Sequence, residues 1–182
     1  MNPLLVSTLL KVAIPLAVIT IALVATRLRG VSWKGDLGLT WPKPAAGAAW
    51  LAIWIAWMAA GEMAIRAFGM EQATPWPDYP LLIVILRIAA IGILGPASEE
   101  IVMRGVLFDR IRRTPLGPVG AIVIVSVAWG LMHYRYAPMT IGLVFLDGLV
   151  LGTARHQSRS TFLAVAMHSL GNLFSIYQSL HS

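Results

Sequence analysis

A small set of ionisable and amide side chains lies within otherwise apolar segments, and their types could carry chemistry. The set is Glu99, Glu100, Arg104, His133, Asp147, His168 and Asn172. Placing an ionisable group at membrane depth costs on the order of 2.5–3.5 kcal/mol, so such a residue indicates a functional site. The residues come from four separate apolar segments, which a helical bundle could bring together.

The two adjacent glutamates have different partners if their segment is helical. Glu100 and Arg104 are four residues apart with the acid first, which favours an ion pair on one helix face. Glu99 points about 100° away from that face and lacks this partner. The spacing therefore predicts one neutralised carboxylate and one free carboxylate that suits a general base. The alternative is a purely structural ion-pair network between two helices.

The remaining polar residues fit the same chemistry. His133 closes an apolar helix, and it could form a water-activating dyad with Glu99 or be an ordinary interfacial histidine. His168 and Asn172 are four residues apart, so they share a helix face and could donate to an oxyanion in acyl transfer. An interhelical hydrogen-bonded pair is the structural alternative. We interpret Asp147 as structural or as lining a wet cavity.

These residues also raise the question of a metal, since two histidines and two glutamates could ligate zinc. Their spacing is not the His-Glu-x-x-His motif of metalloproteases. A Glu99–His133 dyad needs no metal to activate water. We therefore expect no cofactor, and a metal-dependent version of the same site is the alternative.

The composition places these residues in a membrane protein. Of the 182 residues, 58% are hydrophobic and 12% are charged, against roughly 45–50% and 25% in soluble domains. At about 20 apolar residues per crossing, the chain has room for about six spans. We predict an all-α polytopic transmembrane bundle, a single domain over 1–182 with its catalytic core at about 81–180. The absence of cysteine excludes disulfides and cysteine nucleophiles.

Apolar runs locate the expected spans at 3–26, 45–67, 81–113, 119–133, 139–154 and 161–180, with a loop at 68–80. No basic residue precedes Lys11, so we predict that the first run is a retained span and not a cleavable signal. Pro96 is expected to break or kink the third run, which is either one kinked crossing or two elements. Gly148 and Gly152 form a small-xxx-small pair typical of close helix packing.

The basic residues predict the orientation. With six spans, one side holds nine of them and the other holds Arg66 and Arg135. The nine are Arg27, Arg29, Lys34, Lys43, Arg110, Arg112, Arg113, Arg155 and Arg159. The excess marks the cytoplasmic side, with both termini on the other side. The net charge of +6 therefore reflects topology, and we expect no nucleic-acid partner.

Three motifs, taken in this order, resemble the CPBP family of intramembrane proteases. That family includes type II CAAX prenyl endopeptidases and bacteriocin-processing or self-immunity proteins. Its pattern is Glu-Glu-x-x-x-Arg, then Phe-x-x-x-His, then His-x-x-x-Asn. In this sequence the motifs are Glu99-Glu100-x-x-x-Arg104, Trp129-x-x-x-His133 and His168-x-x-x-Asn172. Trp129 stands where the family usually has phenylalanine, which affects pocket shape more than chemistry.

The resemblance implies a glutamic-type endopeptidase of the bacterial inner (plasma) membrane that acts on a membrane-associated peptide or protein. Family substrates are prenylated C-terminal tails, leader peptides and sorting-signal tails, and the sequence does not choose among them. The implied site residues are Glu99 and His133 for water activation, His168 and Asn172 for the oxyanion, and Glu100 and Arg104 for holding the site.

Two non-proteolytic functions are the alternatives. One is a non-catalytic immunity or scaffold protein of the same fold, which would not need all four of Glu99, His133, His168 and Asn172. The other is a small transporter with Glu99 and Arg104 along its pathway. The sequence has no inverted repeat of the kind found in such carriers.

Overall fold

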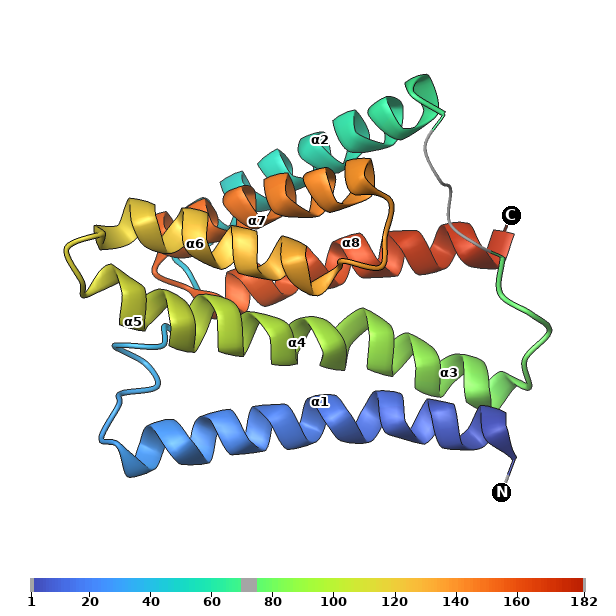
Figure 1. Cartoon of the computed structure of the whole chain (residues 1–182), viewed down its shortest axis with the longest axis horizontal. Helices are drawn as coiled ribbons and strands as arrows, with labels where there is room; N and C mark the ends of the chain where they lie inside the picture. Colours follow the sequence, from blue (N-terminus) through green and yellow to red (C-terminus); the bar gives the residue numbers. More distant parts are fainter. Residues whose placement is uncertain (1, 70–74, 182) are drawn as a thin grey trace.

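In the computed structural model, which describes residues 2–69 and 75–181, every regular element is helical (Figure 1). The elements are α1 Pro3–Leu28, α2 Pro44–Ala67, α3 Leu81–Ala89, η1 Ala90–Leu94, α4 Gly95–Glu100, η2 Ile101–Leu107, α5 Phe108–Arg112, α6 Gly117–Met132, α7 Pro138–Ser158 and α8 Thr161–His181. Those from α3 to α5 follow one another without a break, so the described residues form six helical rods. The all-α prediction with about six segments is confirmed. The predicted loop at 68–80 falls partly on residues 70–74, which lie outside the described residues.

Four rods are long and apolar enough to cross a membrane: Pro3–Leu28, Pro44–Ala67, Leu81–Arg112 and Pro138–Ser158. Gly117–Met132 is a shorter apolar helix. Large apolar side chains on the outer surface are exposed, such as Ile21 on α1 at 67%. A water-soluble protein would bury most of these, whereas lipid tails solvate them.

The third rod remains continuous through Pro96, so the expected break does not occur. The five residues of η1 form a π-helical stretch in which the Gly95 N–H donates to the Ala90 carbonyl, five residues back. Pro96 then lies in the first turn of α4, directly after the π stretch, where its missing N–H leaves one hydrogen bond of the rod unformed. The rod at 81–112 is therefore one element.

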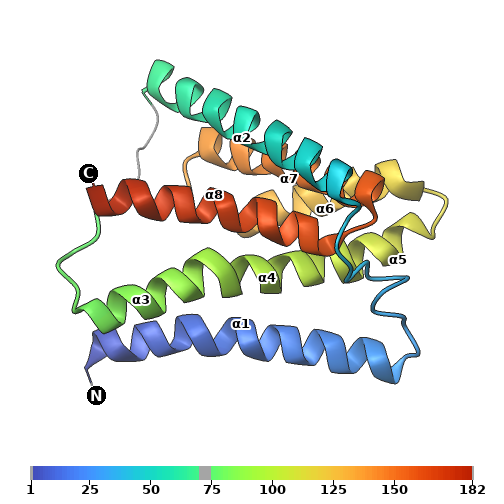
Figure 2. The same ribbon diagram turned by 180° about the vertical axis from the view of Figure 1, so that it is seen from behind.

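The rods lie in successive layers, from α1 through the third rod to α6 and α8, then α7, and finally α2 (Figures 1 and 2). Helix α1 packs along the third rod, and α8 packs on that rod as well. Helix α2 contacts α7 and α8, and the α6–α7 pair makes the most extensive contact. Both termini lie at one end of the bundle, and the α1–α2, α5–α6 and α7–α8 connections lie at the other (Figure 1). The third rod is thus flanked by α1 and α8 where the glutamates occur.

Small residues allow the close α6–α7 contact, as the small-xxx-small pair predicts. A Cβ added at Gly148 would lie 2.9 Å from both Cβ and Oγ of Ser126. One added at Gly152 would lie 3.2 Å from Cγ2 of Ile122. These two glycines therefore set the distance between the helices.

Gly148→Ala is expected to lower the free energy of unfolding by about 1–3 kcal/mol, because overpacking forces the two helices apart. Gly142→Ala in the same helix is the matched control, since nothing lies within 4 Å of its added Cβ. Both changes replace glycine by alanine in one helix, so both gain the same helix propensity. The difference between their free energies of unfolding therefore measures the packing effect. Unfolding by SDS in mixed micelles measures both. Equal stability of the two variants would contradict the packing role.

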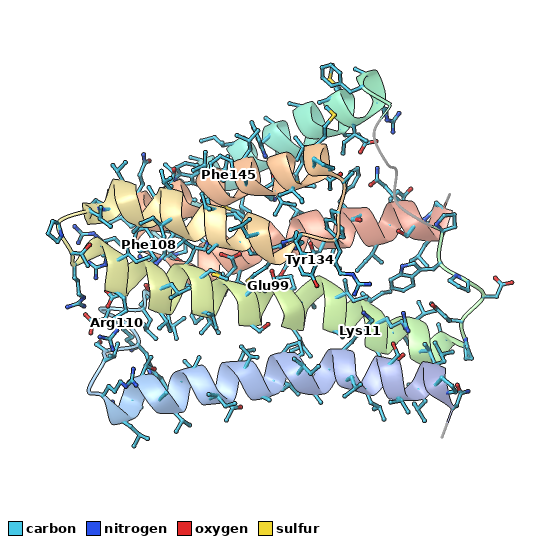
Figure 3. The ribbon with its side chains drawn as sticks, in the orientation of Figure 1. Lys11, Glu99, Phe108, Arg110, Tyr134 and Phe145 are labelled. Atoms are coloured by element: carbon cyan, nitrogen blue, oxygen red, sulfur yellow. The ribbon has the colours of Figure 1, made fainter. Side chains whose placement is uncertain are left out.

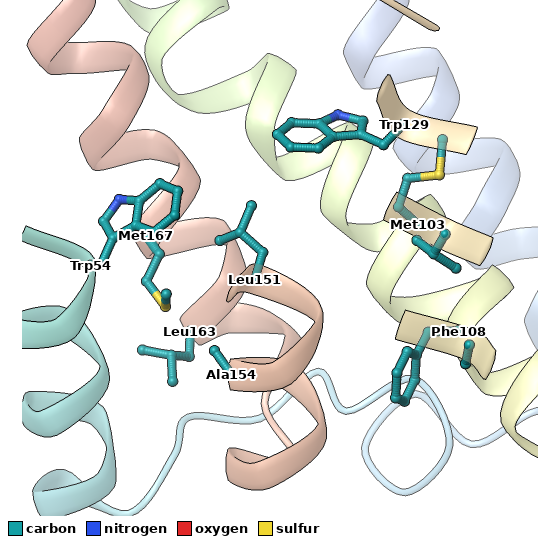
Figure 4. Close-up of a cluster of buried hydrophobic side chains, with 10 residues drawn as sticks. Trp54, Met103, Phe108, Trp129, Leu151, Ala154, Leu163 and Met167 are labelled. Atoms are coloured by element: carbon teal, nitrogen blue, oxygen red, sulfur yellow. The ribbon is translucent and has the colours of Figure 1, made fainter. Parts of the chain in front are cut away.

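The apolar core lies between the site region and the end that holds the α1–α2 connection. It comprises side chains from every rod except α1: Trp54, Met103, Phe108, Ala121, Val125, Trp129, Leu151, Ala154, Leu163 and Met167. Figure 4 shows Trp129 above Met103 and Phe108, with Trp54 and Met167 across the core. Trp129 also contacts the polar site described below, so it joins the core to that site.

The α1–α2 connection is held against the start of α8. Leu37 is 1% exposed, and its carbonyl accepts from Oγ1 of Thr161 at 2.6 Å. The Gly38 carbonyl accepts from the Thr161 N–H at 2.7 Å, and the Thr40 carbonyl from Oγ of Ser160. Gly38 has φ +64, a conformation that favours glycine. The connection is therefore an ordered cover on this end of the bundle.

Candidate active site

The predicted Glu100–Arg104 ion pair is present and fully buried. Oε1 of Glu100 accepts from Nη1 of Arg104 at 2.8 Å, and both side chains are 0% exposed. The same oxygen lies 2.9 Å from Nδ1 of His168. The Arg104 guanidinium lies 4.6 Å from the centre of the Trp129 ring. This carboxylate is therefore committed to one cation and one histidine from another helix.

Glu99 has a different environment, as the helix-face argument predicts. Its Oε2 accepts from Nε1 of Trp129 at 2.8 Å. Among the residues that the structure describes, no cationic side chain lies within ion-pair distance of Glu99. This tryptophan partner was not predicted from the sequence. The signal was the departure from the phenylalanine pattern, because an indole N–H is a donor that phenylalanine lacks.

His133 presents one ring nitrogen to the site. Its Nδ1 lies 2.9 Å from the main-chain carbonyl of Trp129, within the last turn of α6. A carbonyl only accepts, so Nδ1 carries the proton and Nε2 of the neutral ring is left with a free lone pair. The ring is therefore held in the tautomer that a general base requires at Nε2.

Four of the six predicted site residues line one cavity. Glu99, His133, His168 and Asn172 face a space of about 710 Å³, which Lys11 of α1 also lines. Figure 3 labels Glu99, which lies on the third rod, and Lys11, which lies on α1. Glu100 and Arg104 lie behind this wall, where they hold His168 in place.

A second cavity of about 500 Å³ shares His133, His168 and Asn172 with the first one. Its other walls come from α2, α6, α7 and α8, and they include Asp147 and Glu62. These three residues therefore border both cavities. An extended chain entering from either cavity would meet them.

Asn172 fills a gap in the helix hydrogen bonds of the third rod. The Ile91 carbonyl has no main-chain partner because the Gly95 N–H bonds to Ala90 and Pro96 has no N–H. Nδ2 of Asn172 donates to this carbonyl at 2.9 Å. An amide nitrogen carries two hydrogens, so one remains for the cavity. The oxyanion role of Asn172 stays a prediction that uses this second hydrogen.

Asp147 has a partner that the sequence did not reveal. Oδ1 of Asp147 accepts from Nε1 of Trp57 at 2.6 Å, a contact between α7 and α2. The two residues are far apart in the chain, so no local spacing could indicate the pair. Both line the second cavity, which agrees with the interpretation of Asp147 as structural or as lining a cavity.

The sequence model of one family, type II CAAX prenyl endopeptidase Rce1-like, matches residues 80–174. This range spans just over half of the chain and contains all six predicted site residues. The chain belongs to the Rce1-like family. No curated protein and no solved structure matches it. With its long apolar helices, this Rce1-like chain is an integral membrane protein. Helices α1 and α2 lie outside the matched range.

The Rce1-like site does not offer a metal-ligand set. Among the described residues, no three histidine, aspartate or glutamate side chains converge closely enough to hold an ion. Glu100, which the metal alternative would need, already accepts from Arg104 and His168. The expectation of no cofactor stays a prediction.

In this Rce1-like chain Trp129→Phe is expected to cost about 1.5 kcal/mol more unfolding free energy than Trp54→Phe, since a hydrogen bond to a charged group is worth roughly 1.5–3 kcal/mol. Trp54 is a matched control, because it is also a core tryptophan and its Nε1 has no partner among the described residues. SDS unfolding compares the two variants. Equal losses would show that the Trp129–Glu99 bond contributes nothing to stability.

Proposed function

We propose that the chain hydrolyses a peptide bond in a membrane-associated peptide or protein, with Glu99 and His133 activating the attacking water. The observation that carries this proposal is the cavity lined by Glu99, His133, His168 and Asn172 within an apolar bundle. The adjacent Glu100 is neutralised by Arg104, whereas Glu99 has no cationic partner in the described part of the chain. One free carboxylate and one histidine with an available Nε2 are what water activation requires.

The proposed reaction begins when water gives a proton to Glu99 or to Nε2 of His133 and its oxygen attacks the scissile carbonyl carbon. The second hydrogen of the Asn172 amide and Nε2–H of His168 stabilise the resulting oxyanion. Because Nδ1 of His168 donates to the Glu100 carboxylate, the proposed donation from Nε2 uses the form of His168 with a hydrogen on both nitrogens. Collapse of the intermediate breaks the C–N bond, and the stored proton goes to the leaving amine.

The proposed orientation follows from the charges. The nine basic residues of the larger group belong to the bundle end opposite the termini or to helix ends beside it. We assign this end to the cytoplasmic side of a bacterial plasma membrane, with the rods as successive crossings. The site cavity lies between α1, the third rod and α8, so substrate reaches it from within the bilayer.

Oxygen-18 labelling tests hydrolysis directly. The protein is reconstituted in vesicles containing either peptides with one apolar anchor helix or peptides with a farnesylated cysteine near the C-terminus. In oxygen-18 water, mass spectrometry should find one labelled oxygen in the new carboxylate of a product from at least one set. The Glu99→Gln/His133→Ala double variant should give none, and Arg135→Gln, a change in the α6–α7 connection, should be unaffected. No product from either set, or equal product from the double variant, would refute the proposal.

Chelation separates this mechanism from the metal-dependent alternative. Incubation with 1,10-phenanthroline is expected to leave the cleavage rate unchanged, because the described histidine and carboxylate side chains form no group of three around a common point. A loss of activity that added zinc restores would favour the alternative.

A further inference from the structure

A third cavity, of about 400 Å³, lies at the end of the bundle opposite the termini. Its wall is strongly basic and consists of Gly35, Phe108, Arg112, Pro118, Arg155, His156 and Arg159. None of these residues lines either cavity of the candidate active site. In Figure 3, Phe108 and Arg110 mark this end of the molecule. The cavity is therefore a separate feature of the fold.

Arg155 is the buried cation of this cavity. It is 4% exposed, and its Nε and Nη2 donate to the main-chain carbonyls of Arg104 and Asp36, each at 3.1 Å. Its guanidinium also lies 5.4 Å from the centre of the Phe108 ring. Within residues 2–69 and 75–181, no carboxylate lies within ion-pair distance of Arg155. A buried charge without a counter-ion is costly, so an anion in the cavity would be stabilising.

The acidic residues near this cavity pair with other arginines. Asp109 accepts from Arg112 at 2.5 Å and from Arg113 at 3.0 Å. Asp36 accepts from Arg113 and from the Ser32 N–H, and this N–H and the Arg113 guanidinium lower the pKa of its carboxyl. Both carboxylates are thus occupied by Arg112 and Arg113. Two arginines of the cavity wall, Arg155 and Arg159, have no acidic ion-pair partner among the residues that the structure describes.

We propose that this cavity binds the phosphate of an anionic phospholipid headgroup. Arginine forks match phosphate oxygens, and basic pockets between transmembrane helices on the cytoplasmic side suit anionic headgroups. The cavity lies where α5 ends, α6 begins and α7 ends, which is the headgroup level for helices that span the bilayer. Phe108 and Pro118 supply an apolar wall for the glycerol end of the lipid. The proposal rests on the proposed orientation in the membrane and not on the proposed hydrolysis.

Lipid binding is tested on the purified full chain in neutral detergent. Native mass spectrometry measures binding of phosphatidylglycerol and of phosphatidylcholine with the same acyl chains, and melting curves measure their effect on stability. We expect phosphatidylglycerol to bind more tightly and to raise the melting temperature, since Arg155 gains a counter-ion. Inorganic phosphate at equal concentration distinguishes a free anion from a headgroup, and we expect it to have the smaller effect.

Arg159→Gln is the informative variant, because Arg159 is exposed and forms no ion pair in the described part of the chain. It should weaken phosphatidylglycerol binding about fivefold, the effect of one basic residue near an anionic surface. Arg135→Gln removes an equal charge at the other end of the bundle and should change nothing.

Reversing the charge at Arg159 gives a second test, in which lipid binding and the melting temperature without lipid change in opposite directions. Arg159→Glu supplies a carboxylate to the cavity, so it should abolish the phosphatidylglycerol response and melt higher than Arg159→Gln without lipid. Equal binding of the two lipids, unchanged binding by Arg159→Gln, or a response to inorganic phosphate as large as that to phosphatidylglycerol would overturn the proposal.

Discussion

Glu99→Gln is expected to lower kcat for peptide hydrolysis by about 10²–10⁴-fold, the usual contribution of a general base. The substitution removes the charge but keeps the shape, and the amide oxygen of glutamine can still accept from Nε1 of Trp129. The active-site walls should therefore stay in place while the proton acceptor is lost. The fall should appear in kcat rather than in KM, because substrate contacts are unchanged.

The measurement is the initial rate of cleavage in reconstituted vesicles, with melting temperature as the check on folding. Glu99→Asp is the matched variant, since it keeps a carboxylate but shortens its reach, and it should retain more activity than Glu99→Gln. Retention of more than a tenth of the wild-type kcat by Glu99→Gln would remove Glu99 from the catalytic role.

Glu100→Gln is expected to destabilise the protein by about 3–5 kcal/mol, because it leaves Arg104 as a buried charge without its partner. Both side chains are 0% exposed, so solvent cannot compensate for the loss. Oε2 of Glu100 and Nε of Arg104 have no hydrogen-bond partner among the described residues. The ion pair thus offsets only part of its own desolvation cost.

The double variant Glu100→Met/Arg104→Met distinguishes stability from function. Replacing a buried ion pair by apolar side chains of similar volume is often neutral or stabilising, so most of the lost free energy should return. Activity should not return, because His168 loses the carboxylate at its Nδ1. SDS unfolding and the cleavage rate are measured on the same preparations. A double variant that is both stable and active would show that the pair is only structural.

Local spacing was sufficient to predict those features of the site that lie on one helix. The Glu100–Arg104 pair and the different environment of Glu99 follow from helical periodicity, and the structure contains both. The predicted apolar runs matched the six rods because the length of an apolar run indicates a membrane-spanning helix. Their ends were less accurate, since α7 continues to Ser158, four residues beyond the apolar run. Polar residues in a last turn fit a helix that emerges from the membrane.

Contacts between distant segments could not be predicted from spacing. The pairing of Trp57 with Asp147 depends on how α2 packs on α7, and that of Asn172 with the Ile91 carbonyl depends on a π-helical turn. Pro96 was expected to break or kink the third run, and the break does not occur because a π turn, and not an α-helical turn, precedes the ring. The π turn shifts the preceding hydrogen bond by one residue and so accommodates the ring.

The two π-helical stretches act as phase shifts within the third rod. A π turn uses an i→i+5 hydrogen bond where an α turn uses i→i+4. Each stretch therefore behaves like one residue inserted into an otherwise α-helical rod. One inserted residue corresponds to a rotation of about 100° between the segments on either side.

The glutamates lie between these shifts, because η1 precedes α4 and η2 follows it. The side of α3 that faces its neighbours, and that of α5, are therefore each rotated relative to α4. The direction of Glu99 is thus not fixed by the orientation of either neighbouring segment alone. The number of residues between Leu81 and Glu99 is consequently as constrained as the glutamates themselves. A deletion of Gly92 from η1 would conserve the six predicted site residues and still rotate the carboxylates relative to α3.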